Sequence, residues 1–181
     1  MRKLLLLFIV ILVAITLFAD QMQDDAYIEE DTSTSDDLDF STSSGEDGLE
    51  KKRGTALEAK QLSIKAYKYI KENGKEKAFE KFMSKDPEFF YKDLYIFVID
   101  IKGNMLVHPV DSSLMNKNLY NLKDSKGKYF IQNFIKLISE YENGWEQYYW
   151  RNYTTQEIES KLTYLIKIDD ETFLGCGAYQ Q

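Results

Sequence analysis

The stretch Asp93-Leu94-Tyr95-Ile96-Phe97-Val98-Ile99-Asp100 (DLYIFVID, residues 93–100) decides the fold. Between its two aspartates every side chain is apolar or aromatic and favours extended backbone. A strand that is apolar on both sides has both faces of its sheet covered, so we expect this run to be a central strand. Turn residues follow at 100–104, and a second strand at residues 105–108 closes at Pro109. The two strands are predicted to form a β-hairpin.

Two amphipathic helices are predicted before this hairpin. Thr55 and Glu58 have the spacing of a capping box, and apolar side chains then recur at helical spacing until the stop signal at Gly74. A shorter amphipathic stretch around residues 78–82 is ended by Pro87. We therefore expect a long helix and then a short one.

The chain after the hairpin is predicted to contain a loop, a helix and a strand meander. Residues 110–127 are polar and rich in turn formers, and an amphipathic helix follows from Phe130 to Tyr141. Three more strands are expected, at residues 145–151, 158–167 and 172–179. The fold class is therefore α+β: a five-stranded antiparallel sheet with the long N-terminal helix on one face and the loop–helix excursion of residues 110–142 over the other. A small ligand would sit under that excursion.

The first nineteen residues have the pattern of a secretory signal. Arg2 and Lys3 precede an uncharged apolar run at residues 4–18, and the small residue Ala19 follows. The run is short for a membrane-spanning helix, which needs about 20 residues. We expect residues 1–19 to be a cleaved signal peptide, with an uncleaved N-terminal anchor as the open alternative.

Residues 20–54 are predicted to be an acidic disordered linker. Residues 20–50 carry twelve aspartates and glutamates and no lysine or arginine. Such a segment cannot bury enough apolar surface to offset its chain entropy. The remaining residues 51–181 hold 21 basic and 18 acidic side chains, so this part of the chain has a charge of about +3 despite the overall −7.

Several classes of function are excluded by what the sequence lacks. Cys176 is the only cysteine, so there is no internal disulfide and no cysteine at the signal boundary for a lipid anchor. One cysteine and one histidine cannot fill a zinc site. The chain has no phosphate-binding glycine loop, dinucleotide fingerprint or serine elbow, and no basic stripe for nucleic acid. We therefore expect a protein that is not an enzyme and needs no cofactor or metal.

Several stretches, in this order and spacing, resemble the single Cache domain, a PAS-like extracellular sensor module. The stretches that carry the resemblance are residues 66–79, 93–100, Gly103, 107–109, 116–119, Asp124, Gly127-Lys128, Gly144-Trp145, Tyr148, Trp150, Lys161, Tyr164 and 175–179. The resemblance covers about residues 58–180. It implies a pocket for a small extracellular ligand, often an organic acid or amino acid, and signalling through the N-terminal helix to a membrane-linked partner, as in chemotaxis.

The sequence differs from receptor members of that family because it stops at Gln181, just after the last expected strand. We therefore expect a stand-alone periplasmic or secreted binder, or the partner of a separate receptor, tethered to the inner membrane only if the signal segment stays uncleaved.

Candidate ligand-binding residues follow from position and from the resemblance. His108 ends the second strand and could donate to a ligand carboxylate, although it could equally be a structural histidine bonded to nearby backbone. Lys161 opens a strand and could supply positive charge to an anion; only the family resemblance distinguishes it from the other lysines. Tyr148 and Trp150 lie two apart on one strand, so both face the same side and could line a pocket.

Further candidates are pocket-wall residues for which core packing is the competing interpretation, namely Tyr95, Phe97, Tyr129, Tyr164 and Tyr179. Pro109 and Gly177 are also candidate ligand-binding residues. Gly175 and Gly177 would allow close approach of a ligand or of a helix. A rival to ligand binding is a structural or surface-interaction protein whose pocket is filled by aromatic side chains, and the identity of any ligand stays open.

Overall fold

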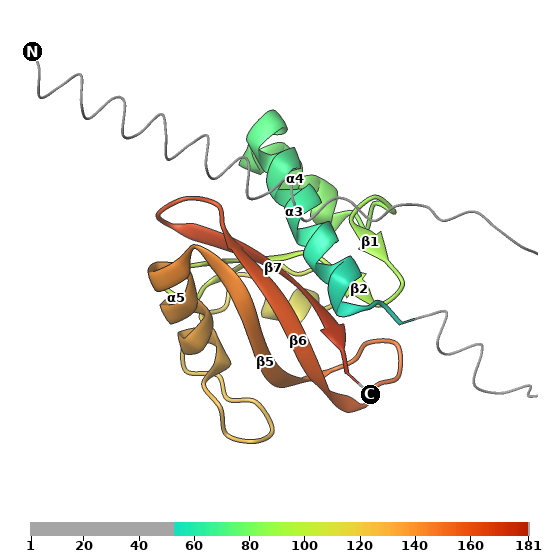
Figure 1. Cartoon of the computed structure of the whole chain (residues 1–181), viewed down its shortest axis with the longest axis vertical. Coiled ribbons are helices and arrows are strands. Elements are labelled where there is room, and N and C mark those ends of the chain that lie inside the picture. Colours follow the sequence, from blue (N-terminus) through green and yellow to red (C-terminus); the bar gives the residue numbers. More distant parts are fainter. Residues whose placement is uncertain (1–52, 181) are drawn as a thin grey trace, which may run out of the picture. The chain divides into compact units, whose positions relative to one another are not determined.

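The computed structural model describes residues 53–180, so the predictions for a signal segment and most of the acidic linker lie outside the described residues. Within this range a long helix and a short helix lie on one side of an antiparallel sheet, and a third helix lies on the other (Figure 1). No helix among residues 53–180 is long and apolar enough to span a bilayer. The same range contains no cluster of three or more residues suited to hold a metal ion.

Helix α3 (Ala56–Asn73) begins as the capping box predicted. The Glu58 backbone N–H donates to Thr55 Oγ1 at 3.1 Å, and the Thr55 backbone N–H donates to a Glu58 carboxylate oxygen at 2.7 Å. The helix ends where Gly74 takes a φ of 84°, a backbone conformation that favours glycine. Helix α4 (Lys75–Met83) then packs beside α3.

The main sheet has five antiparallel strands in the order β4-β3-β7-β6-β5. Its strands are β3 (Phe97–Asp100), β4 (Met105–Val107), β5 (Asn143–Arg151), β6 (Ile158–Lys167) and β7 (Thr172–Tyr179). The β3–β4 hairpin and the β5-β6-β7 meander confirm the predicted arrangement. The middle strand is β7, whose eight side chains are all buried, whereas β3 lies second from one edge.

The apolar run at residues 94–99 does not form one continuous strand, which corrects the prediction. Strand β2 (Leu94–Tyr95) pairs with β1 (Phe90–Tyr91) in a separate two-stranded ribbon, and only from Phe97 does the chain pair with β7. Leu94 fills the space beside Gly54, where an added Cβ would lie 2.2 Å from Leu94 Cγ. Leu94 thus packs at the start of α3, and both faces of this part of the run are buried as expected.

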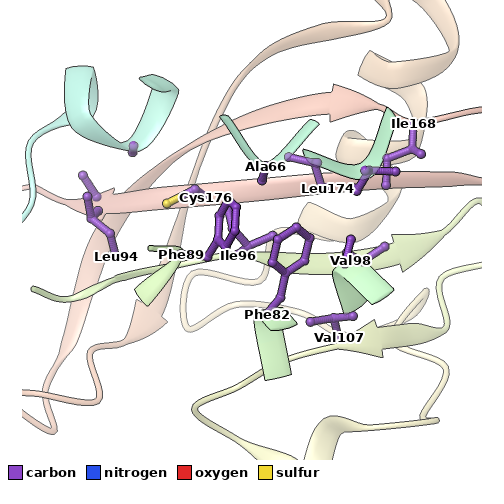
Figure 2. Close-up of a cluster of buried hydrophobic side chains, with 14 residues drawn as sticks. Ala66, Phe82, Phe89, Leu94, Ile96, Val98, Val107, Ile168, Leu174 and Cys176 are labelled. Atoms are coloured by element: carbon purple, nitrogen blue, oxygen red, sulfur yellow. The ribbon is translucent and has the colours of Figure 1, made fainter. Parts of the chain in front are cut away.

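The sheet separates two hydrophobic cores. On one face α3 and α4 cover a core that includes Phe82, Phe89, Leu174 and Cys176, and Figure 2 shows these side chains gathered between the helices and the strands. On the other face helix α5 (Phe130–Tyr141) and the loop before it cover a second core. Both faces of the sheet are therefore covered, as predicted. The face on which a ligand was expected is the one covered by α5.

The packing of α3 can be tested by two aliphatic truncations on the same helix. Ile70 is 4% exposed within the α3-side core, whereas Leu57 is 57% exposed. We expect Ile70→Ala to lower the free energy of unfolding by about 2–5 kcal/mol, because it leaves a cavity. Leu57→Ala should change it by less than about 0.5 kcal/mol. Urea unfolding of both variants measures the difference, and equal losses would show that α3 is wrongly placed.

Candidate functional site

A small cavity lies within the α5-side core, between the sheet and helix α5. The residues that line it are Tyr95, Phe97, Ile99, Met105, His108, Leu119, Phe130, Ile131, Phe134, Tyr148 and Trp150. Its free volume is about 20 Å³, and on the same measure a single water needs roughly 10–15 Å³. The cavity is apolar except where Tyr95, His108, Tyr148 and Trp150 bring polar atoms. As it stands, it is almost filled by aromatic side chains.

Strand β5 presents two aromatic residues to this cavity. Tyr148 lies opposite Lys161 on β6, and Trp150 lies opposite Glu159, so both point to the α5 side of the sheet. The Tyr148 ring stacks on Phe130 of α5, with ring centroids 4.5 Å apart and nearly parallel planes. The prediction that Tyr148 and Trp150 share a face is confirmed, and their role towards a ligand stays a prediction.

Lys161 is a buried cation next to the cavity. Its side chain is 1% exposed, and Nζ donates to the hydroxyl oxygen of Tyr95 at 2.9 Å and, more weakly, to that of Tyr179 at 3.5 Å. The ammonium also lies over both rings, 4.1 Å and 4.6 Å from their centroids. Within residues 53–180 no carboxylate forms an ion pair with it. Burial accordingly lowers the pKa of Lys161 to about 8.

Gly177 makes room for this lysine. A Cβ at Gly177 would lie 2.1 Å from Thr163 Oγ1 and 2.6 Å from Lys161 Cε. The space above the glycine is therefore taken by side chains of the neighbouring strand β6, rather than by a helix. Tyr179 continues the same network, since its hydroxyl donates to the backbone carbonyl of Arg151 at 2.8 Å.

His108 is held in one tautomer by the backbone. Nδ1 accepts a hydrogen bond from the Asp111 N–H at 3.0 Å, so the neutral ring carries its proton on Nε2. The ring meets Tyr95 edge to face at 5.2 Å and is 3% exposed. Burial, and then the charge of Lys161, lower the pKa of His108 to about 4. At neutral pH the residue is an uncharged donor, and the structural bond predicted as the alternative is present as well.

The remaining candidates fall into three groups. Tyr95 and Phe97 line the cavity, and Pro109 is buried next to His108 without lining it. Tyr129 is 40% exposed at the start of α5 and lies outside the cavity lining. Tyr164 lies on the opposite face of the sheet, where its hydroxyl donates to Asn143 Oδ1 and Lys60 of α3 lies over its ring. The structure therefore does not bring Tyr129 and Tyr164 together with the other candidates.

Two polar residues of the site were not predicted. Thr163 lies on β6 between Lys161 and Leu165. Its hydroxyl donates to the Tyr148 hydroxyl at 3.4 Å. Asp93 is fully buried at the start of β2, where its Oδ1 accepts the Gly54 backbone N–H at 2.6 Å. The sequence offered no local signal for Asp93, because its burial depends on the contact with Gly54, 39 residues away.

The single cysteine does not join the site. Cys176 belongs to the α3-side core (Figure 2), whereas His108 lines the cavity on the other face. Burial raises the pKa of the Cys176 thiol to about 12, so it is protonated at neutral pH. The two residues therefore cannot act as a nucleophile and its base.

A five-stranded antiparallel sheet with helices α3 and α4 on one face and a loop–helix segment enclosing a cavity on the other defines a sensor-type domain. The chain belongs to the family described as Single Cache domain 2, whose model matches residues 51–181. The resemblance seen in the sequence is thereby confirmed. The domain is a sensory module and is not itself catalytic.

Solved structures support the same assignment. A methyl-accepting chemotaxis protein from Vibrio parahaemolyticus RIMD 2210633 is 27% identical with a TM-score of 0.60, covering 68% of this chain and 86% of that one. A structure described as the structural basis for carboxylic acid recognition by a Cache chemosensory domain is 18% identical with a TM-score of 0.60, covering 77% of this chain and all of that one. A periplasmic sensor domain of a chemotaxis protein is 17% identical with a TM-score of 0.54, covering 75% of this chain and 92% of that one. The last of these similar structures is thus a periplasmic sensor domain.

One curated relative is a sensor histidine kinase, MctS, from Rhizobium johnstonii (strain DSM 114642 / LMG 32736 / 3841). It is 34% identical over 89 residues, which cover 49% of this chain and 19% of the relative. The match therefore spans about a fifth of that kinase and concerns a single stretch of it.

The buried charge of Lys161 predicts a pH-dependent stability. The folded domain holds this proton less tightly than the unfolded chain, whose lysine pKa is near 10.5, so the cost of burying the charge is full below about pH 8 and is relieved as pH rises towards 10.5. Relative to Lys161→Met, the wild-type free energy of unfolding should rise by about 1.4 kcal/mol per pH unit between about pH 8.5 and pH 10.

Urea unfolding of both proteins across this pH range measures the difference, in which the titration of Cys176 and the buried tyrosines cancels. Lys68→Met, at an exposed position on α3, is the matched control and should run parallel to wild type. Parallel curves for Lys161→Met would mean that the Lys161 amine is solvated in the folded domain.

Proposed function

We propose that this Cache domain binds a small carboxylate, an organic acid or an amino acid, and acts as a sensor outside the cytoplasmic membrane. It does so as a stand-alone periplasmic or secreted binder or as the partner of a membrane receptor. The signal-type pattern of residues 1–19 supports export, and retention of that segment would tether the protein to the inner membrane. The family and its periplasmic members support the same location.

The observation that carries the proposal is the buried, unpaired ammonium of Lys161. Its acceptors are two neutral tyrosine hydroxyls, and taking an ammonium out of water costs several kcal/mol. A domain that needs only a packed core gains nothing from a cation at this position. A ligand carboxylate would give this ammonium a direct anionic partner, and so a function in the liganded domain.

The groups around Lys161 suit a small acid. Tyr95 lies between Lys161 and the cavity, accepting from Nζ through its hydroxyl and contacting His108 through its ring. The Nε2 proton of His108 is an additional donor for an anion. Tyr148 and Trp150 offer aromatic surface for the apolar part of the ligand. A small acid placed between these groups would have polar partners for its carboxylate and aromatic surface for its apolar part.

Ligand entry requires movement of the cavity wall. A free volume of about 20 Å³ admits a water but not a carboxylic acid. The ligand therefore binds a more open form in which aromatic side chains have shifted, and binding energy is spent on that opening. This requirement favours acids of a few heavy atoms over larger ones.

The same small volume favours a second candidate function. If the aromatic side chains never separate, the domain is a structural or surface-interaction module whose pocket has been filled. The two candidates differ in one measurable property, the response of the folded domain to small acids.

Thermal unfolding of the purified full chain distinguishes them. Acetate, propionate, lactate and a set of amino acids are tested, with propionamide as the uncharged match of propionate. A ligand at 100 times its dissociation constant should stabilise the fold by about 2.7 kcal/mol, a rise in melting temperature of roughly 10 °C. Lys161→Met should lose this rise, because the anion no longer meets a positive charge.

Lys68→Met, which removes an exposed lysine of the same charge, should respond to the ligand as wild type does. If no acid or amino acid stabilises the wild type, the structural candidate is favoured. If Lys161→Met binds as well as wild type, the anion site has been placed wrongly.

A further inference from the structure

Asp93 carries a buried carboxylate oxygen that has no hydrogen-bond partner. The residue is 0% exposed, and its Oδ1 accepts from the Gly54 backbone N–H at 2.6 Å. Its Oδ2 is the one buried side-chain nitrogen or oxygen atom in residues 53–180 that lacks a partner. An unsatisfied buried oxygen destabilises the fold, and more so when it is charged, so its retention asks for an explanation.

The surroundings of Asp93 contain both signs of charge. The titratable groups that interact with it come from the start of α3, from the loop after β5 and from strands β6 and β7; they are Arg53, Tyr153, Lys161, Cys176 and Tyr179. Arg53 already forms a two-pronged ion pair with Glu159, at 2.7 and 3.1 Å. Lys161 is therefore the cation near Asp93 that has no carboxylate of its own.

Asp93 and Lys161 attract each other without direct contact. Each shifts the pKa of the other towards the charged form, yet no ion pair within 4.0 Å joins them in the described structure. Burial nevertheless raises the pKa of Asp93 above its usual range. The unliganded domain thus buries an amine and a carboxyl group that influence each other but form no ion pair within 4.0 Å.

A ligand carboxylate changes this balance. Two carboxylates then share one ammonium, and like charges in a buried site cannot both stay ionised at little cost. A ligand in the cavity contacts His108, and it reaches Lys161 once Tyr95, which lies between them, has shifted, whereas Asp93 is held by its hydrogen bond from Gly54. We propose that Asp93 is the charge partner of Lys161 in the empty domain and is protonated when an anionic ligand takes its place.

This inference rests on the proposed function and adds a regulator to it, since ligand binding becomes coupled to proton uptake. Affinity for the acid should fall as pH rises through the pKa of Asp93 in the liganded domain, because the bound state holds one more proton than the free state. The Asp93–Gly54 hydrogen bond places this event at the N-terminus of α3. A sensor of this kind would respond to acid and pH together.

Calorimetry of the full chain with propionate tests the coupling. Titrations at pH 6.5 are run in buffers of different ionisation enthalpy, where Lys161 stays protonated in both states. We expect the binding heat to depend on the buffer, showing proton uptake by the protein. In Asp93→Asn, which keeps an oxygen for the Gly54 N–H, that dependence should disappear and affinity should rise by roughly tenfold, the equivalent of one pKa unit.

His108→Gln separates the other titratable group that faces the ligand. It should bind propionate more weakly but take up the same number of protons per ligand bound. Loss of proton uptake in His108→Gln, or a wild-type heat that is independent of buffer, would overturn the inference even if Asp93→Asn does not fold. Absence of any propionate binding to the wild type would instead count against the proposed function itself.

Discussion

The burial of Lys161 within the sheet constrains much of the structure around it. Its ammonium lies over the rings of Tyr95 and Tyr179, and its chain occupies the space left free by Gly177. Tyr95 lies on β2, Lys161 itself on β6, and Tyr179 and Gly177 on β7, so one polar group ties the three strands together. Because water is excluded there, the group must be satisfied by the protein, and the geometry of those segments follows from that need.

The two faces of the sheet have different tasks as a result. The α3 face holds an apolar core with aliphatic and aromatic side chains and a protonated thiol, which is a stable attachment for the long helix. The α5 face combines an aromatic core with the buried polar network of Lys161, Tyr95 and His108. Asp93 connects the two, since it lies near Lys161 and bonds the residue that precedes α3. A change of charge on the cavity side therefore has a short path to the helix.

Sequence patterns predicted the elements well because they depend on local chemistry. The capping box at Thr55, the glycine at position 74 and the alternation along β5 each act over a few residues. The break at Ile96 could not be predicted, since the residues on both sides of it are equally apolar and differ only in their partners, β1 for β2 and β7 for β3.

The site was predicted in part, for similar reasons. Side chains three apart on a strand face opposite sides, so the spacing of Lys161 and Tyr164 already indicated that both could not line one pocket. Tyr129 lies at the start of a helix whose rotation the sequence does not fix. Asp93 was missed because its burial depends on a contact with Gly54, 39 residues away. Long-range contacts of this kind leave no periodic pattern in the chain.

The small volume of the cavity sets the energetics of any sensing. The stacked pair of Phe130 and Tyr148 spans the wall between α5 and β5, and such a pair contributes about 0.5–1.5 kcal/mol beyond its buried area. If ligand entry separates the two rings, losing this contact lowers the fraction of molecules in the open form by roughly two- to tenfold. The apparent affinity falls by the same factor, because only the open form binds. The same separation moves Phe130, and with it the start of α5, relative to the sheet. A cavity that must open to admit a ligand therefore binds that ligand more weakly. The same opening couples ligand binding to a movement of α5 relative to the sheet.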